Sequence, residues 1–207
     1  MMGRTHVTVA TAIYCTYTLP KTLEDLPMWG MGLGAVLLSS LLPDLDEPRS
    51  RIGGLLLPII PSYLRPLAFT LIGAYLAYTG ASNGIWWLLL VGLTLLFLVM
   101  IRHRESPTHA LVGLGLVLSL TYSWKPELIV PVLIGYGSHL VLDIITEGIS
   151  LLWPIPMRIR IPIMSTNSLL ERWVVYRGSQ VWILVMIIQV VNKEVLQPIQ
   201  NFVHRFW

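Results

Sequence analysis

The sequence contains little charge and almost no cysteine. Only 12% of its 207 residues are charged, 55% are hydrophobic and the mean hydropathy is +0.69, whereas an ordinary soluble domain has roughly 25% charged residues. Its one cysteine, Cys15, excludes a disulfide framework and any zinc site built from several thiolates. The net charge is only +3 and the chain has no run of basic residues, so nucleic acid is not an expected partner.

Polar intervals that could act as linkers are also missing. Apolar blocks follow one another along the chain, without an internal repeat or a low-complexity tract. The N-terminal segment lacks the cleavage site of a secretory signal, so we expect it to remain in the mature protein. We therefore expect residues 1–207 to form a single membrane-embedded domain.

Seven segments are apolar enough for membrane helices, because a bilayer core of about 30 Å needs about 20 helical residues, or fewer where a segment is buried among neighbours. The most apolar, residues 84–101, has a tryptophan pair at one end and is followed by an arginine, as interfacial anchors are. The predicted helices cover residues 5–19, 28–42, 66–79, 84–101, 109–124, 127–153 and 179–191. The sequence thus predicts an all-α fold, a polytopic membrane bundle of about seven transmembrane helices.

Basic residues mark one side of this predicted bundle. With seven spans, the segments before the first helix and after the second, fourth and sixth share one side, which collects ten of the fourteen basic residues. These ten are Arg4, Arg49, Arg51, Arg65, Arg102, Arg104, Arg158, Arg160, Arg172 and Arg177. The positive-inside rule places that side and the N-terminus in the cytoplasm, which predicts a multi-pass membrane protein with a cytoplasmic N-terminus. Residues 153–178, rich in proline, form the longest predicted connection and could cover a site like a lid.

Potential metal ligands gather at the same predicted cytoplasmic helix ends. His139 and Asp143 are four residues apart, so both side chains lie on one helix face about one turn apart. Imidazole and carboxylate suit zinc, manganese or iron, and ionisable groups inside a membrane helix are costly and usually functional. The alternative is a polar pair that only ties this helix to a neighbour.

Two further segments carry residues of the same types. Asp44 and Asp46 follow Pro43, and their alternate spacing points both carboxylates the same way if the backbone is extended. They could instead cap a turn or pair with nearby arginines. Residues 102–109, RHRESPTH, contain two histidines, His103 and His109, with Thr108 as an expected helix cap. Arg102 and Arg104 could hold a phosphate, or could only anchor the loop at the membrane surface.

Taken together, these residues resemble the YdjM family of bacterial and archaeal inner-membrane proteins, whose founding member is regulated by LexA. The resemblance rests on Thr5-His6, on the LPDLD segment ending at Asp46, on His103-Arg104 with Thr108-His109, and on Ser138-His139-Leu140 with Leu142-Asp143 and Thr146. Trp153-Pro154 and Glu171 fit its end region. One departure is the spacing of His103 and His109. Five residues separate them here, whereas four separate the corresponding histidines of the family. The family is described as metal-dependent, phospholipase-like hydrolases, so the resemblance implies that activity for this chain.

The combined interpretation is a membrane hydrolase with a site for one or two divalent metals, zinc first, with manganese, iron or magnesium as alternatives. The expected ligands are His6, Asp44, Asp46, His103, His109, His139 and Asp143. Arg104 or Arg102 would bind the phosphate of a lipid ester or phosphoester that arrives from the leaflet, and Asp44 or Asp46 would accept a proton. His204 falls on the other side and is excluded. A divalent-cation or proton-coupled transporter and a non-catalytic scaffold with a structural metal are the alternatives, whereas a His-Glu-x-x-His protease motif is missing.

Overall fold

The computed structural model describes residues 2–47, 54, 57–100 and 106–192. Within these ranges the chain forms seven α-helices and no β-strand, which confirms the predicted all-α fold. The helices are α1 (Gly3–Tyr17), α2 (Leu26–Ser39), α4 (Arg65–Ser82), α5 (Trp86–Met100), α6 (Leu111–Trp124), α7 (Ile129–Ile144) and α8 (Gly178–Val191). Shorter helical turns are η1 (Leu23–Asp25), η2 (Leu42–Asp46), η4 (Pro107–His109), η5 (Pro126–Leu128) and the π-helical η6 (Leu170–Arg177).

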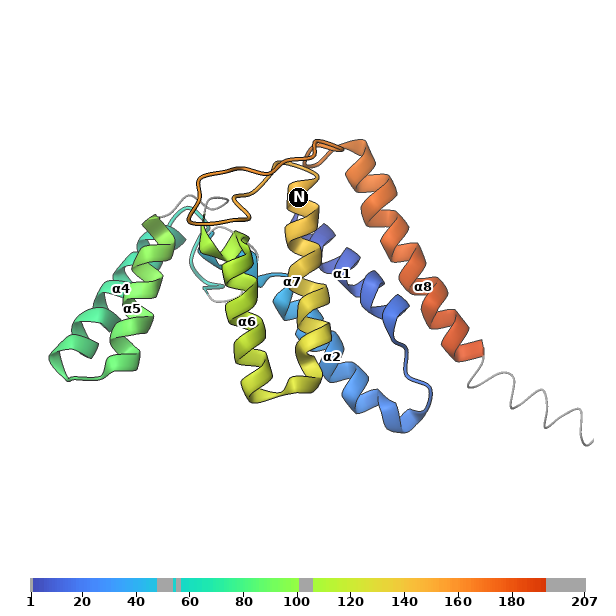
Figure 1. The fold of residues 1–207 in the computed structure, drawn as a ribbon, viewed down its shortest axis with the longest axis horizontal. Helices are drawn as coiled ribbons and strands as arrows, with labels where there is room; N and C mark the ends of the chain where they lie inside the picture. The colour runs from blue at the N-terminus through green and yellow to red at the C-terminus, as the bar shows by residue number, and fades with distance from the viewer. Residues whose placement is uncertain (1, 48–53, 55–56, 101–105, 193–207) are drawn as a thin grey trace, which may run out of the picture.

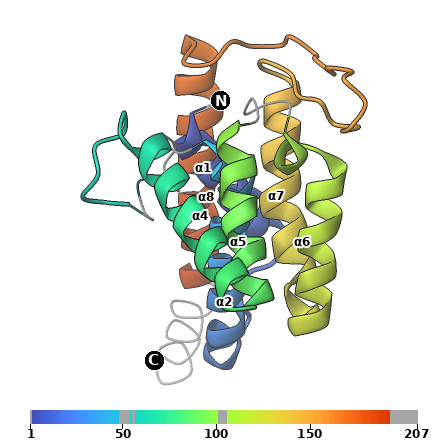
Figure 2. The same ribbon diagram turned by 90° about the vertical axis from the view of Figure 1, so that its left-hand side faces the viewer.

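Helix α7 occupies the centre of the main bundle and contacts α1, α2 and α6 (Figures 1 and 2). Ala10 and Tyr14 of α1 pack with Val36 of α2 in one core cluster. A second cluster joins Tyr136 and Leu140 of α7 to Ile149, beyond the end of that helix. Figure 1 shows that α7 ends at the same end of the bundle at which α1 and α6 begin.

Two predicted helix boundaries are wrong. The helix expected over residues 127–153 ends at Ile144, because the chain turns back at Gly148 and Ile149 pairs with Ile159 in an isolated antiparallel bridge. Gly148 has a φ of +82°, and a β-carbon there would lie 2.7 Å from that of Arg160, so only glycine fits this turn without strain. The last helix, expected from residue 179, begins earlier, since η6 continues directly into α8.

Helices α4 and α5 form a tightly packed hairpin that stands apart from the main bundle (Figure 1, left). A β-carbon on Gly92 of α5 would lie 2.3 Å from the backbone nitrogen of Ala77, so the two helices approach closely at a small residue. The outer faces of the hairpin expose large apolar side chains, among them Leu71, Tyr75 and Leu90. Exposed apolar surface of this extent indicates contact with lipid or with another protein.

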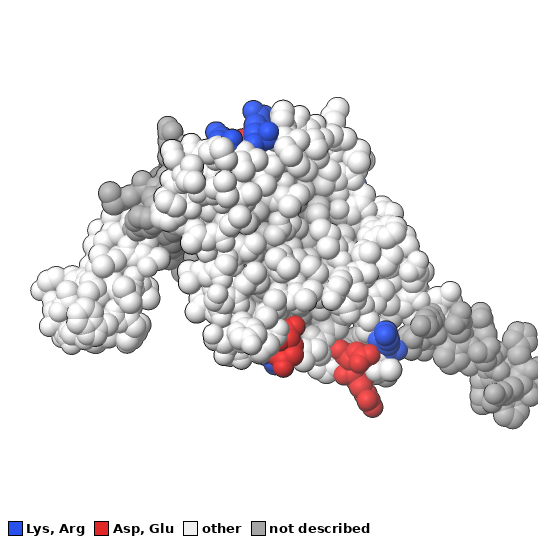
Figure 3. All heavy atoms as spheres, in the orientation of Figure 1, with Lys and Arg blue, Asp and Glu red and all other residues white. Residues whose placement is uncertain are grey.

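In Figure 3, the charged side chains of the described residues lie at the upper and lower ends of the molecule, and the surface between these ends is uncharged on the face shown. Two continuous helices, Pro126–Ile144 and Leu170–Val191, are long and apolar enough to cross a membrane. Shorter apolar helices are Leu26–Ser39, Trp86–Leu96 and Leu111–Trp124. The number of spans expected from the sequence therefore stays a prediction.

Candidate metal centre

Three histidines and two aspartates from four separate elements meet at the end of the bundle where α7 terminates. His6 comes from α1, Asp44 from η2, His109 from η4, and His139 and Asp143 from successive turns of α7. The three imidazoles and the side chain of Asp143 are at most 3% exposed, whereas the side chain of Asp44 is 15% exposed. A buried cluster of this kind is costly unless its charges are paired or bind a cation.

The distances within this cluster have the length expected between ligands of one metal ion. His139 Nε2 lies 3.4 Å from Asp143 Oδ2 and 3.5 Å from Asp44 Oδ1. His109 Nε2 lies 3.5 Å and 3.8 Å from the same two oxygens. A tetrahedral ion bonded to four ligands at about 2.0–2.1 Å holds them about 3.3–3.4 Å apart, which is longer than a good N–H···O hydrogen bond. Four of the six edges of such a tetrahedron, those between a nitrogen and an oxygen, therefore measure 3.4 to 3.8 Å.

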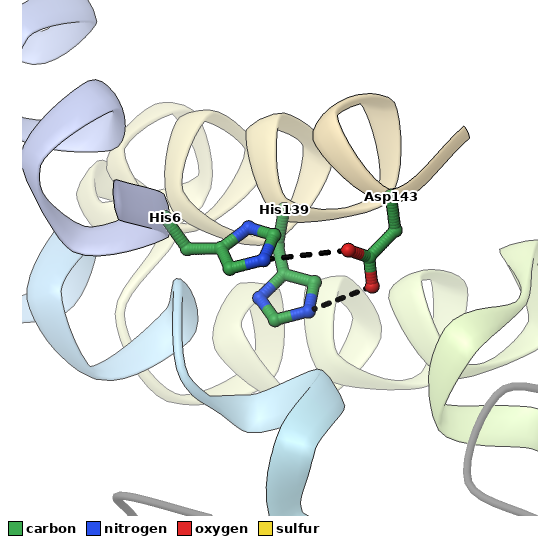
Figure 4. Close-up of side chains that lie close together, drawn as sticks. All are labelled: His6, His139 and Asp143. Carbon is green, nitrogen blue, oxygen red and sulfur yellow. Dashed lines mark ion pairs between the residues drawn. The ribbon is translucent and has the colours of Figure 1, made fainter. Parts of the chain in front are cut away.

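His6 faces the other oxygen of the same carboxylate. Its Nε2 lies 3.4 Å from Asp143 Oδ1, whereas His109 and His139 face Oδ2. The ring of His6 stacks on that of His139, with centroids 3.7 Å apart (Figure 4). Asp143 thus presents Oδ1 to His6 and Oδ2 to His109 and His139, an arrangement that would suit a carboxylate shared by two metals. The potential ligands form two overlapping groups that share His139, namely His6, His139 and Asp143, and Asp44, His109 and His139.

Contacts with the backbone fix the orientation of His139. Its Nδ1 lies 2.7 Å from the carbonyl oxygen of Ser40, and because a carbonyl only accepts, Nδ1 carries a hydrogen. In the neutral ring, Nε2 then presents its lone pair toward the carboxylates. Nε2 is buried and makes no hydrogen bond to any described residue. A buried lone pair that faces two carboxylates fits a site for a cation.

Thr108 holds η4 against η2. Its hydroxyl donates to the carbonyl oxygen of Pro43 at 2.9 Å, and Tyr136 of α7 donates its hydroxyl hydrogen to the Thr108 carbonyl. These bonds join the segment that carries His109 to the segment that carries Asp44. The prediction that Thr108 caps the following helix is wrong, since α6 begins after Ala110 and no side chain caps it.

Glu171 is a supporting residue that the sequence analysis did not include in the site. It is fully buried, and one of its oxygens accepts hydrogen bonds from the backbone nitrogen of Met2 and the hydroxyl of Thr5, both at 2.8 Å. Its other oxygen accepts from the backbone nitrogen of Asn167. Glu171 therefore holds the amino end of α1, one residue before His6. An acidic residue at the start of a long apolar segment is the sequence feature that could have identified it.

Some of the predicted site residues cannot be compared with this arrangement. His103, Arg102, Arg104 and the excluded His204 lie outside the described residues, and for Asp46 only the backbone, at the end of η2, is described. The structure brings the other five predicted ligands together, namely His6, Asp44, His109, His139 and Asp143.

Comparison with known proteins gives a family for the chain. No curated protein and no solved structure matches it. The family described as YdjM inner membrane protein matches residues 1–197, which is nearly the whole sequence. The chain with this buried cluster of histidines and aspartates therefore belongs to the YdjM family of inner membrane proteins.

Proposed function

We propose that this protein is an integral-membrane, metal-dependent hydrolase that acts on a lipid ester or phosphoester at the cytoplasmic membrane face. The observation that carries the proposal is the set of four contacts, 3.4 to 3.8 Å long, between two imidazole nitrogens and two carboxylate oxygens. Nitrogen and oxygen ligands in this number suit zinc, with manganese, iron or magnesium as alternatives.

Each ligand has a distinct role in this proposal. Asp44, His109, His139 and Oδ2 of Asp143 would hold one ion. His6 and Oδ1 of Asp143 would supply ligands for a second ion, so Asp143 would contribute to both positions. Bound divalent metal would supply Lewis-acid chemistry, activating water near neutral pH and stabilising the leaving oxygen.

The remaining steps belong to residues of the chain. Asp44 is the most exposed of the five clustered ligands, so substrate is expected to approach from its side. Asp46 follows on the same short helical turn and is proposed to accept a proton. Arg104 is proposed to hold the phosphate by its guanidinium fork, with Arg102 as the alternative.

The membrane arrangement belongs to the same proposal. We propose that all seven helices span or enter the bilayer, with the N-terminus in the cytoplasm and lipid surrounding the apolar faces of α4, α5 and α8. The ligands lie at helix ends, whereas transporter sites usually lie near the middle of the membrane between repeats. This position supports a hydrolase over a transporter.

A second candidate is a non-catalytic membrane scaffold with a structural metal. Structural metal sites are closed, and three of the clustered ligands are histidines that are at most 1% exposed. The partial exposure of Asp44 is the feature that favours catalysis instead.

Metal analysis followed by an activity screen tests the proposal. The purified protein should contain zinc or another divalent metal, and it should hydrolyse a member of a phospholipid and isoprenoid-phosphate panel. Chelation and the His139→Ala substitution should each abolish turnover. A protein that holds stoichiometric metal but hydrolyses none of these lipids would favour the scaffold, and a protein without bound metal would refute both candidates.

A further inference from the structure

A long segment between two membrane-length helices carries features of a lipid-binding surface. We call residues 149–168 the interfacial strap. The helix Pro126–Ile144 ends shortly before it and the helix Leu170–Val191 begins shortly after it. Backbone hydrogen bonds from Ile161 to Ile144 and from Ile163 to Ile145 tie the strap to the end of α7. It crosses the same end of the bundle as the N-terminus (Figure 1). In an inner membrane protein, a segment at this position lies at the depth of the lipid headgroups.

The strap combines exposed apolar side chains with arginine. Its large apolar side chains are exposed by 57% at Ile155, 47% at Met157, 54% at Ile161 and 61% at Ile163. Arg158 and Arg160 lie between them and are also exposed. A loop in water gains nothing by exposing large apolar residues, whereas a segment at the membrane surface buries them among the acyl chains beside its basic residues.

A cavity of about 390 Å³ opens between the strap and the start of η6. Its lining residues include the polar Arg160, Ser165 and Ser168 and the apolar Ile163 and Met164. Residues that can donate hydrogen bonds, together with apolar residues, suit a lipid headgroup joined to its acyl chains.

Arg160 is held in place at this cavity. Its Nε donates to the carbonyl oxygen of Thr146 at 3.0 Å, just beyond the end of α7. The two terminal nitrogens of the guanidinium make no hydrogen bond to any described residue. A guanidinium anchored through Nε keeps these nitrogens in a fixed plane, the arrangement that binds two oxygens of a phosphate.

We infer that the cavity lined by Arg160, Ser165 and Ser168 binds the phosphate of an anionic phospholipid, whose acyl chains pass the exposed isoleucines of the strap. This binding site extends the proposed function. It rests on that function only for the hydrolysis of the lipid after it has bound. Arg160 is anchored to Thr146, which follows the ligand Asp143 by less than one helical turn. A headgroup bound by Arg160 would therefore lie at the same end of α7 as the proposed metal centre.

The test measures lipid binding to the chelator-treated, full-length protein in detergent, so that no metal-dependent turnover can occur. Native mass spectrometry would count bound phosphatidylglycerol and, as a comparison, phosphatidylcholine. Arg160→Ala and Arg160→Gln should each weaken phosphatidylglycerol binding by at least about tenfold, the loss expected for a charge-assisted contact. The glutamine retains a donor for the Thr146 carbonyl, so a shared loss would come from the missing charge.

Arg172→Ala is the matched control. Arg172 is an exposed arginine near the start of η6, close to the cavity in sequence, but it does not line the cavity. Unchanged binding in this control supports the site. Equal losses in the Arg160 and Arg172 variants would show general charge attraction and overturn it. Equal competition by millimolar inorganic phosphate would also overturn it, since the cavity would then prefer a free anion to a lipid.

The two proposals fail separately in this design. Arg160-dependent lipid binding by a protein that hydrolyses no lipid would refute the hydrolase and leave the headgroup site standing. Wild-type lipid binding by both Arg160 variants would refute the headgroup site, whatever the activity of the metal centre.

Discussion

The rings of His6 and His139 lie flat against each other, with 12° between their planes, and each presents Nε2 to a different oxygen of Asp143 at 3.4 Å. His6 belongs to the first helix and His139 to the central one. One carboxylate thus joins the start of the chain to the core of the bundle, and replacing any of the three residues should change metal binding.

We expect His139→Ala and Asp143→Ala to lose nearly all bound metal, because each removes a ligand atom. Thr108→Val should weaken metal binding by about 10–100-fold, the usual cost of removing an outer partner that orients ligands. Metal content by elemental analysis and affinity by chelator competition would measure the series. His204→Ala is the histidine control and should keep wild-type metal. The same metal content in all four variants would mean that the cluster is structural.

The two aspartates after Pro43 should differ in their effects. Asp44 lies within 3.8 Å of both His109 and His139, so Asp44→Asn should abolish metal binding and turnover together. Asp46→Asn should keep metal and lower the single-turnover rate by about 10²–10⁴-fold, as expected for loss of a general base. If both variants keep the metal content and the rate of the wild type, Asp44 and Asp46 serve only as helix caps.

Glu171→Gln should lower both thermal stability and metal affinity. The amide keeps the size of the side chain but weakens the two charge-assisted bonds that hold Met2 and Thr5. Because His6 follows Thr5, we expect metal affinity to fall by about tenfold, as for other outer partners of a metal site. Chelator competition and thermal unfolding would be compared with Glu127→Gln, an exposed acidic residue at the other end of the bundle. Unchanged metal affinity in Glu171→Gln would restrict Glu171 to a role in folding.

Labelling of single cysteines would test the orientation of the protein in the membrane. Cys15 is only 2% exposed, so the natural chain provides a low background. Cysteines at Arg158 and Arg172 should react from the cytoplasm, and those at Lys21 and Glu127 from the other side, because the arginine-rich end follows the positive-inside rule. The opposite pattern would place the metal centre outside the cell membrane.

Gly92→Ala should separate the α4–α5 hairpin and lower its stability by about 1–3 kcal/mol, the usual cost of overpacking. A methyl group at this position would overlap the backbone of Ala77. Gly115→Ala in α6 is the control, since nothing lies within 4 Å of its added β-carbon. Thermal unfolding in detergent should show a loss for the first variant and no loss for the second, and equal effects would contradict the close packing.

The sequence predicted helix content well and the packing of helices poorly. Trp86–Met100 agrees closely with the predicted residues 84–101, because an unbroken apolar run leaves little doubt about its extent. The same uniformity gives no preferred face, so nothing in the run predicts that α5 packs on α4 and stands apart from the bundle.

Candidate ligands could be chosen from residue type and spacing, as for His139 and Asp143, but their partners could not. The stack of His6 on His139 depends on how α1 crosses α7, which no local pattern encodes. The end of α7 was missed because apolar residues continue beyond Ile144, at positions 145, 149 and 151–153, and the turn depends on the conformation of Gly148 and on pairing with Ile159.

The bond between Glu171 and the amino end of α1 has a consequence for biosynthesis. The ribosome makes Met2 and Thr5 first, but their shared acceptor emerges only after all five clustered histidines and aspartates have been made. The start of α1 can therefore be fastened in its final position only after the chain has been made as far as Glu171. A chain truncated before Glu171 would contain all five clustered ligands and still leave the start of α1 unfastened.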